Sequence, residues 1–303
     1  MCENVAKPFL KWAGGKGQLL NKFEGLYPLQ LKQGNIEIYI EPFIGGGAVF
    51  FDVIQKYNIK KAVIIDINKE LINCYRCIKA DSAQVIRKLS ELQNQYLILD
   101  EKMRAELYYN ARKEYNEIHL NGKYDFKKAA DFIFLNKTCY NGLYRVNSKG
   151  EFNVPHGRYK SPMICDSKNI TLVGKLLQNV DIIYGDYTEC EKYLIKDTFV
   201  YFDPPYRPLA EFGSFVNYSK NGFDDEEQIK LADFYKKVNK TGSLLMLSNS
   251  DPKNINSNDN FFDELYKDFN LQRISAKRMI NCQAEKRGNV TEIVITNYKG
   301  ENK

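Results

Sequence analysis

The chain has 303 residues, of which 44% are hydrophobic and 27% are charged, and its formal net charge is +6. This length and composition predict a globular protein with a sizeable core and argue against wholesale disorder. Because no apolar run approaches ~20 residues, the first residues lack a signal-peptide segment and the seven cysteines are scattered, we expect a cytoplasmic protein with reduced thiols.

Positive charge is concentrated in three stretches of the chain. Residues 1–22 carry four basic residues against one acidic residue, while residues 137–162 and 272–288 each carry five against one. Such clusters are typical of a protein that binds a polyanion. Three ordinary solvated loops would give the same pattern, so charge alone leaves both interpretations open.

Strands and helices alternate at both ends of the sequence. Apolar runs of strand length fall at residues 36–40, 62–65, 180–184, 199–202, 244–247, 271–275 and 292–298. Helical spacing and helix-start residues predict helices at 48–54, 69–79, 224–239 and 261–269. The pattern predicts an α/β protein with a doubly wound, mostly parallel sheet, in which the alternating residues 292–298 form an edge strand.

The middle of the chain follows a different pattern. Amphipathic helices are predicted near residues 81–98, 101–119 and 125–139, with no strand signal among them. A β-hairpin is predicted next, from 143–146 to 151–154, because the four residues between these runs end in a glycine that can adopt a positive φ. We expect this helical block with its hairpin to be an insertion into the α/β domain.

Four acidic residues follow predicted strands, where open α/β sheets bind their ligands. They are Glu41, Asp66, Asp186 and Asp203. The glycine turn at 45–47 lets backbone approach a ligand closely. Asp66 lies 21 residues beyond Gly45, where nucleotide-binding folds place the acid that holds ribose hydroxyls. A nucleoside is therefore the expected ligand.

The same turn favours S-adenosylmethionine over a dinucleotide. Phe50 occupies the third glycine position of a G-x-G-x-x-G motif, and Glu41 before the turn would repel a pyrophosphate. Glu41 suits a cationic ligand instead, and S-adenosylmethionine carries a ribose, an α-ammonium and a sulfonium but no phosphate. A purely structural glycine turn stays an alternative.

The run Asp203-Pro204-Pro205-Tyr206 directly follows a buried apolar strand. The prolines fix φ and remove two N–H donors, which leaves a rigid turn that presents the Asp203 carboxylate and the Pro204 carbonyl as acceptors. Two acceptors beside an aromatic ring fit the exocyclic amine of a planar base. We expect Tyr206 to stack on the base while the acceptors hold the amine with its lone pair aimed at the sulfonium methyl.

Two other motifs have structural interpretations. Cys74-x-x-Cys77 lies in a predicted helix with no second pair at zinc spacing, so a buried helix face is favoured over metal or redox chemistry. His119 and His156 lie far apart, and neither forms a recognisable triad motif. No metal is expected.

In their order and residue identities, these motifs resemble those of the Dam-type DNA adenine-N6 methyltransferases of the α group, particularly GATC-specific members of restriction-modification systems. The matching segments are Phe9-Leu10-Lys11-Trp12-Ala13-Gly14-Gly15-Lys16, Glu41-Pro42-Phe43-Ile44-Gly45-Gly46-Gly47, Asp66-Ile67-Asn68, Asn141-Gly142-Leu143-Tyr144-Arg145-Val146-Asn147, Phe152-Asn153-Val154-Pro155 and Asp203-Pro204-Pro205-Tyr206-Arg207-Pro208. The resemblance implies a Rossmann-like methyltransferase domain, residues 1–69 and 166–303, with an inserted target-recognition domain, residues 70–165.

The resemblance also implies roles at matching positions. The S-adenosylmethionine site would be lined by Trp12, Lys16, Glu41, Phe43, Gly45, Asp66 and Asp186. The catalytic motif that holds the flipped adenine would be Asp203, Pro204, Pro205 and Tyr206. The DNA-binding residues would be Lys11, Leu143, Arg145 and Pro155. A two-stranded ribbon fits the major groove, and arginine commonly reads guanine, which agrees with the last assignment.

The expected function is methyl transfer from S-adenosylmethionine to adenine N6 in double-stranded DNA at GATC, by base flipping and direct attack of the amine. Adenine methylation at another site, amino methylation of RNA or of a protein glutamine, and a silent DNA-binding module stay alternatives, and a nicotinamide oxidoreductase is disfavoured by the turn at Glu41. We expect a prokaryotic or phage-encoded protein for which a monomer would suffice, and the sequence leaves open whether a restriction endonuclease accompanies it.

Overall fold

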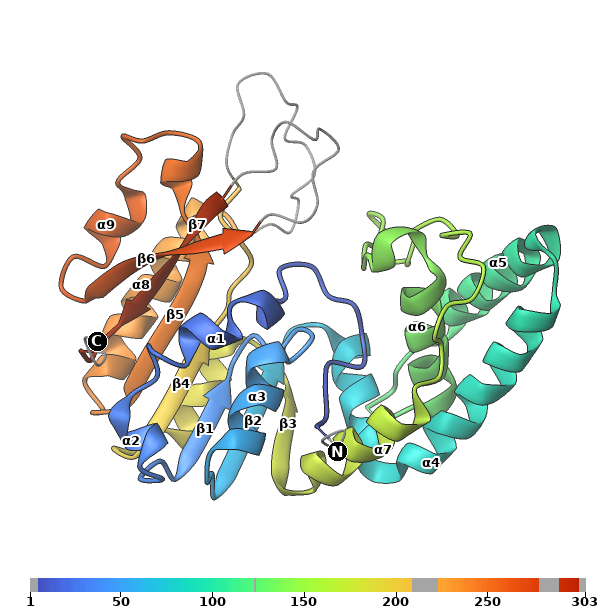
Figure 1. The fold of residues 1–303 in the computed structure, drawn as a ribbon, viewed down its shortest axis with the longest axis horizontal. Coiled ribbons are helices and arrows are strands. Elements are labelled where there is room, and N and C mark those ends of the chain that lie inside the picture. The colour runs from blue at the N-terminus through green and yellow to red at the C-terminus, as the bar shows by residue number, and fades with distance from the viewer. Residues whose placement is uncertain (1–4, 123, 209–222, 278–288, 300–303) are drawn as a thin grey trace. The chain divides into compact units, whose positions relative to one another are not determined.

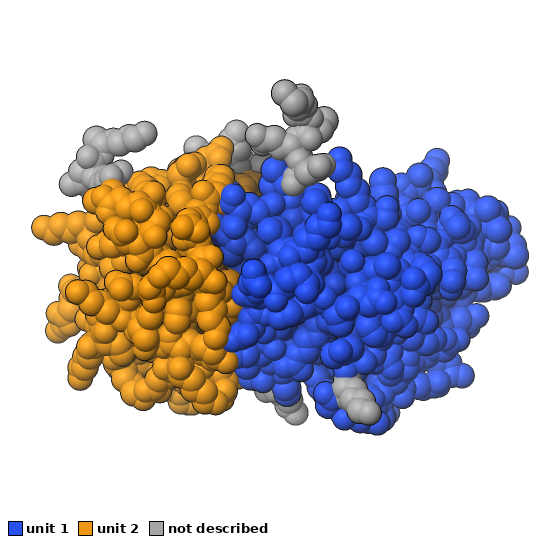
Figure 2. Space-filling view, turned by 90° about the horizontal axis from the view of Figure 1, so that it is seen from below, with its two compact units in different colours: residues 1–15, 44–55, 66–185 blue, residues 16–43, 56–65, 186–303 orange. Residues whose placement is uncertain are grey.

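The computed structural model describes residues 5–122, 124–208, 223–277 and 289–299. The chain forms two compact units (Figure 2). Unit 1 comprises residues 1–15, 44–55 and 66–185, and unit 2 comprises residues 16–43, 56–65 and 186–303. Among the described residues, no helix is both long enough and apolar enough to cross a membrane.

Unit 2 is built on a mixed β-sheet (Figure 1). Its strands are β1 (Ile38–Glu41), β2 (Lys61–Asp66, of which Asp66 belongs to unit 1), β4 (Thr198–Phe202), β5 (Leu244–Ser250), β6 (Asn270–Lys277) and β7 (Asn289–Thr296). They lie in the order β2-β1-β4-β5-β7-β6. Pairing is parallel from β2 through β5, whereas β7 is antiparallel to both β5 and β6. The predicted α/β class with a mostly parallel sheet is confirmed.

The burial of each strand explains its place in the sheet. All five residues of β4 are buried, as expected for an inner parallel strand whose two faces are both covered. The prediction that residues 292–298 form an edge strand was wrong, because β7 lies between β5 and β6. Ile293, Val294 and Ile295 are consecutive and buried, so both faces of β7 are packed. On this side of the sheet the edge strand is β6.

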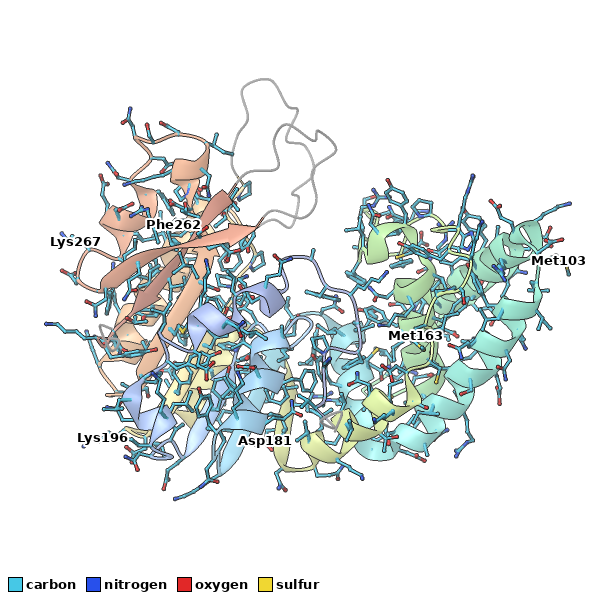
Figure 3. All side chains as sticks on the ribbon, viewed as in Figure 1. Met103, Met163, Asp181, Lys196, Phe262 and Lys267 are labelled. Atoms are coloured by element: carbon cyan, nitrogen blue, oxygen red, sulfur yellow. The ribbon has the colours of Figure 1, made fainter. Side chains whose placement is uncertain are left out.

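Unit 2 has four α-helices among its described residues, and one of them begins at a side-chain cap that the sequence predicts. They are α1 (Leu20–Phe23), α2 (Leu29–Lys32), α8 (Asp225–Asn239) and α9 (Phe261–Leu265), with 3-10 turns at Lys16–Gln18, Tyr187–Tyr193 and Pro252–Asn254. The side chain of Asp224 accepts a hydrogen bond from the N–H of Glu227 and so caps α8, as predicted. Phe262 of α9, labelled in Figure 3, is fully buried. The centroid of its ring lies 6.5 Å from that of Tyr266, with 27° between the ring planes.

Unit 1 contains the predicted helical block. Its elements are α3 (Ala48–Lys56, of which Lys56 belongs to unit 2), α4 (Lys69–Ile98), α5 (Glu101–Glu117), α6 (Phe126–Thr138), η2 (Tyr140–Gly142), α7 (Ser167–Leu176), η3 (Leu177–Asn179) and β3 (Val180–Tyr184). Helix α4 is kinked at Asp81, whose backbone is extended, which explains why the sequence predicted two helices there. Cys74 and Cys77 are buried on α4, in agreement with a structural helix face.

The predicted hairpin is shorter than expected. Only one antiparallel bridge forms, between Val146 and Phe152, instead of two four-residue strands. The second arm is held by α5, because Asn116 bonds the backbone N–H and C=O of Phe152, and Tyr108 donates to the carbonyl of Val154. These side chains take the place of a further strand. Unit 1 contains residues 1–15 and 44–55 as well as all of the predicted insertion, so the compact units do not correspond to the two predicted domains. The predicted domain limits at residues 70 and 165 therefore stay a prediction.

Candidate functional site

The glycine turn of unit 1 is built around an indole. Gly45 has a φ of +46°, and a Cβ at this position would lie 2.8 Å from Cδ1 of Trp12. Only glycine allows this backbone conformation and this approach without strain. The other predicted partner, Asp66, accepts hydrogen bonds from the N–H groups of Gly45 (3.0 Å) and Asn68 (2.8 Å). Unit 1 therefore brings together three predicted cofactor residues, Trp12, Gly45 and Asp66.

The Asp66 carboxylate holds the turn in place and keeps further acceptor capacity. Burial raises the pKa of Asp66, and the hydrogen bonds from Asn68 and Gly45 oppose this effect. Each oxygen of a carboxylate has two lone pairs, so Asp66 can accept bonds from ligand hydroxyls while it keeps its bonds to the backbone.

In unit 2, Asp203 lies directly after β4 and is the centre of a partly buried polar cluster. Its Oδ1 accepts hydrogen bonds from Nζ of Lys16 (2.5 Å) and from Oγ of Ser248 (3.2 Å). The Lys16 ammonium also lies 4.7 Å from the centroid of the Tyr206 ring and 4.0 Å from Oε2 of Glu292. The hydroxyl of Tyr206 donates to Oε1 of Glu292 (2.9 Å). Lys16, predicted to line the cofactor site, thus contacts the predicted catalytic acid and aromatic ring.

One ammonium and two carboxylates set the electrostatics of this cluster. Burial lowers the pKa of Lys16, but Asp203, Tyr206 and Glu292 outweigh burial and raise it above its ordinary value, so Lys16 stays charged. Burial raises the pKa of Asp203, and Lys16 and Ser248 offset this only in part. Burial likewise raises the pKa of Glu292. The site therefore holds acceptors that bind a proton more readily than carboxylates in water.

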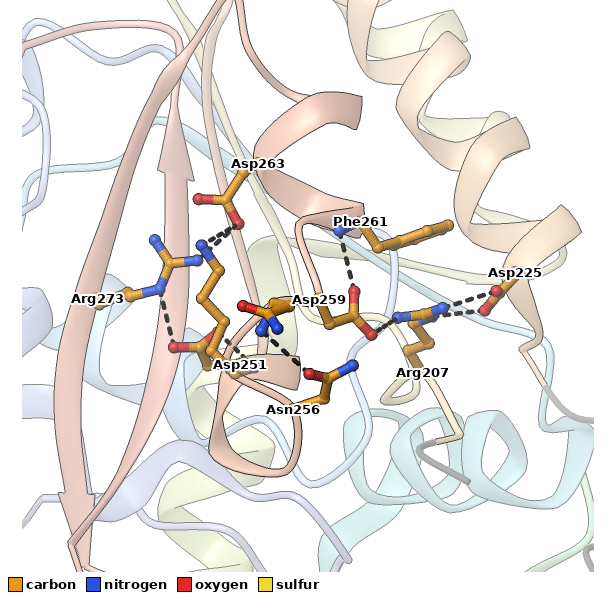
Figure 4. Close-up of polar contacts among 10 residues, drawn as sticks. Arg207, Asp225, Asp251, Asn256, Asp259, Phe261, Asp263 and Arg273 are labelled. Carbon is orange, nitrogen blue, oxygen red and sulfur yellow. Dashed lines mark hydrogen bonds and ion pairs between the residues drawn. The ribbon is translucent and has the colours of Figure 1, made fainter. Parts of the chain in front are cut away.

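The residues that follow Asp203 are held in place by burial of Pro204 and by hydrogen bonds at Pro205 and Arg207. Pro204 is buried, and the carbonyl of Pro205 accepts a hydrogen bond from the buried Gln228 side chain of α8 (3.0 Å). Arg207 then forms two hydrogen bonds to Asp225, at 2.6 and 2.8 Å (Figure 4). The turn is thereby anchored to the start of α8 while 37% of the Tyr206 surface stays exposed.

Of the remaining cofactor candidates of unit 2, Glu41 and Phe43 each contact an aromatic residue, whereas Asp186 is exposed. Glu41 is buried and accepts a hydrogen bond from the Tyr39 hydroxyl (2.5 Å), and burial raises its pKa well above the ordinary value. Phe43 stacks on Tyr187 with ring centroids 5.4 Å apart. Asp186 is exposed and accepts a hydrogen bond from a backbone N–H in the 3-10 turn that follows, so its observed contact is a cap.

The four DNA-binding candidates, Lys11, Leu143, Arg145 and Pro155, are exposed residues of unit 1. The guanidinium of Arg145 donates to Oδ1 of Asn153 (2.8 Å), which holds the arginine across the short hairpin. The carbonyl of Pro155 accepts from the N–H of Tyr140 (2.9 Å). Much of the basic stretch at 137–162 is exposed, whereas most of the basic residues of the stretch at 272–288 lie outside the described residues.

Three contributors to the unit 2 cluster escaped sequence reasoning. Ser248 and Glu292 come from β5 and β7, and Arg207 follows the motif. A signal for Glu292 exists in the sequence, because it is a charged residue next to the apolar run Ile293-Val294-Ile295. Nothing in the spacing connects it to Tyr206, which is 86 residues away along the chain.

A mixed α/β sheet with an Asp-Pro-Pro-Tyr turn directly after an inner strand is the arrangement expected of S-adenosylmethionine-dependent amino-methyltransferases. Comparison with known proteins narrows this class. The family described as D12 class N6 adenine-specific DNA methyltransferase matches residues 12–280. The chain belongs to this family, which confirms the predicted family and enzyme class.

Curated relatives extend over nearly the whole chain. Type II methyltransferase M.MjaIII of Methanocaldococcus jannaschii is 52% identical over 293 residues, covering 96% of this chain and 99% of the relative. Type II methyltransferase M1.LlaDCHI of Lactococcus lactis subsp. cremoris is 40% identical over 294 residues, covering 96% and 95%. DNA adenine methylase of Escherichia coli strain K12 is 31% identical over 288 residues, covering 95% and 94%.

Proposed function

We propose that this enzyme methylates adenine N6 within GATC in double-stranded DNA, and that it flips the target base out of the duplex before transfer. The observation that carries the proposed reaction is the cluster in which Lys16, Glu292 and Ser248 surround the Asp203–Tyr206 motif, whereas the GATC site is proposed from the resemblance of the sequence motifs alone. Extraction of a base costs ~ a few kcal/mol, which stacking on Tyr206 would offset.

In the proposed reaction, the Asp203 carboxylate and the Pro204 carbonyl accept hydrogen bonds from the adenine amine and orient its lone pair. S-adenosylmethionine supplies an electrophilic methyl group on a sulfonium. When bound, this cofactor would give up its methyl group to N6, so that the S–CH3 bond would break as the N6–CH3 bond forms and the departing sulfide would keep the bonding electrons. The amine then loses one proton, for which Asp203 is a suitable acceptor because burial raises its pKa.

The donor and acceptor set fits this cofactor. Asp66 has lone pairs left for ribose hydroxyls, and Glu41 is a buried carboxylate that can accept from an α-ammonium. A cationic ligand would also favour the ionised form of Glu41, which burial alone disfavours. Trp12 and Phe43 supply aromatic surfaces, and Gly45 allows backbone to approach. We assign cofactor binding to these residues together with Lys16 and Asp186.

Sequence-specific recognition is assigned to Lys11, Leu143, Arg145 and Pro155. Their exposure on unit 1 and the hydrogen bond that aligns Arg145 with Asn153 support the assignment. We further propose that the enzyme is a cytoplasmic monomer of a restriction-modification system. The Type II names of two relatives support the partnership with an endonuclease.

The proposal is tested by methyl transfer from labelled S-adenosylmethionine to matched duplexes that differ only in GATC against GTAC, followed by nucleoside analysis. Label in N6-methyladenine from the GATC duplex alone is the expected result. Equal label from both duplexes would overturn the site and keep the reaction. No label in either, with cofactor bound, would redirect the search to RNA, protein glutamine or a silent DNA-binding role.

A further inference from the structure

The chain between residues 5 and 15 belongs to no helix or strand, yet side-chain amides hold it. Three amides each make a two-point contact with one residue, accepting from its N–H and donating to its C=O. The pairs are Gln55 with Ala6 (2.7 and 3.0 Å), Asn169 with Lys7 (2.9 and 3.0 Å) and Asn136 with Lys11 (2.8 and 2.8 Å). Each amide thus supplies one acceptor and one donor to the backbone, as a neighbouring β-strand would.

Asn136 differs from the other two amides in its burial and in the reach of its third bond, because the third bond of Gln55 goes to the carbonyl of Phe51 in its own helix (2.6 Å). It lies in the last turn of α6, and only 1% of its surface is exposed. Its Nδ2 also donates to the carbonyl of Gly142 (3.1 Å). An amide side chain offers one oxygen and two N–H groups, and all of them are used here. Asn136 therefore ties the backbone of Lys11 to the residue directly before Leu143.

Gly142 leaves room for the side chain of Lys11. Its φ is +64°, and a Cβ at this position would lie 2.8 Å from Cβ of Lys11. The Lys11 side chain thus crosses the α-carbon of Gly142, and its ammonium lies 4.8 Å from the centroid of the Tyr159 ring. Any larger residue at position 142 would displace this side chain. The direction in which Lys11 leaves the surface is consequently set by Asn136 and Gly142.

We propose that Asn136 is a positioning residue for recognition of the target sequence, because it fixes Lys11 and Leu143 in one arrangement, with Gly142 as the seat for the Lys11 side chain. The inference rests on the proposed function, in which Lys11 and Leu143 contact the duplex. Base readout depends on donors held within ~0.5 Å of their productive places by a supporting set of hydrogen bonds.

The chain offers a matched control. Asn73 of α4 is also buried, with 4% of its surface exposed, and it makes the same two-point contact with the backbone of Asp125 (2.8 and 2.9 Å) elsewhere in unit 1. The measured quantity is the ratio of kcat/KM on the enzyme's own target duplex to kcat/KM on duplexes with one base pair of the site replaced. We expect Asn136→Ala to lower this ratio at least tenfold. Asn73→Ala should leave it unchanged although both variants unfold at lower urea.

A double variant identifies the route. If Asn136 acts through Lys11, Lys11→Ala combined with Asn136→Ala discriminates no worse than Lys11→Ala alone. Gly142→Ala disturbs Lys11 without removing a buried amide, and it should also lower the ratio of kcat/KM on the target duplex to kcat/KM on altered duplexes. This variant tests the proposal if Asn136→Ala does not fold.

The outcomes separate the two proposals. A wild-type enzyme that methylates no DNA overturns the proposed function. A selective wild-type enzyme whose Asn136→Ala or Gly142→Ala variant keeps full discrimination, or whose Asn73→Ala variant loses as much, overturns this inference alone.

Discussion

The ion pairs of Arg207 hold the chain directly after the proposed catalytic motif, Asp203–Tyr206, and they make a quantitative prediction possible. The guanidinium bonds Asp225 at 2.6 and 2.8 Å and Asp259 at 2.7 Å, and it lies 4.0 Å from the ring centroid of Phe261 (Figure 4). Only 15% of the Arg207 side chain is exposed. These contacts attach the motif to α8 and to the segment before α9.

Arg207→Met keeps the alkyl stem and removes every donor. Hydrogen bonds to charged groups contribute about 1.5–3 kcal/mol each when shielded, but the Asp225 side chain is 52% exposed and its share is reduced by solvent. We expect the free energy of unfolding to fall by about 2–3 kcal/mol. Since a displacement of about 1 Å can cost about 100-fold in rate, the methyl transfer step should slow roughly 10- to 100-fold.

Arg273 provides the matched control for this prediction. It forms the same type of clamp, to Asp251 (2.9 Å) and Asp263 (2.7 Å), but it does not adjoin the motif (Figure 4). Urea unfolding and single-turnover methyl transfer would be measured for both methionine variants. Similar losses of stability with a slow reaction only in Arg207→Met are expected. An undiminished rate in Arg207→Met, or an equal loss in Arg273→Met, would refute the reasoning.

Three further predictions concern the glycine turn at Gly45, the polar cluster around Asp203 and the residues assigned to DNA recognition. Gly45→Ala places a Cβ against the indole and should weaken binding of S-adenosylmethionine about tenfold by equilibrium dialysis, whereas Gly150→Ala, at a φ of +80° with nothing within 4 Å, should not change it. Lys16→Met removes the charge that lowers the pKa of Asp203, so the acid limb of the plot of kcat against pH should move to higher pH. An acid limb at the same pH as in the wild type would contradict this prediction. Arg145→Ala should cost about 1–3 kcal/mol of discrimination at one base pair, and full selectivity in a competition assay would exclude it as a reader.

The sequence predicts local elements well because their causes are local. The burial of β4 and the cap at Asp224 follow from apolar runs and from a side chain close to its partner in the chain. The place of β7 between β5 and β6 was missed because alternation along one strand does not report what covers its second face. The hairpin was overestimated because side chains of α5 take hydrogen bonds that a longer ladder would have used.

The sequence suggested individual residues for the candidate site, but it did not predict which of their side chains contact one another. Lys16 was expected beside the cofactor, and the structure places its ammonium on Asp203, 187 positions later. Contacts at that distance depend on how strands are ordered, which spacing does not determine. The partnership of Glu292 with Tyr206 and the clamp of Arg207 have the same origin.

The most direct test of the account compares methyl transfer and DNA binding in one variant. Asp203→Ala removes the proposed acceptor of the adenine amine and leaves the residues assigned to recognition untouched. In single-turnover reactions on a GATC duplex we expect the rate to fall roughly 100-fold or more, while the dissociation constant for the duplex changes less than about threefold. Undiminished transfer by Asp203→Ala would contradict the assignment of the motif as the catalytic site.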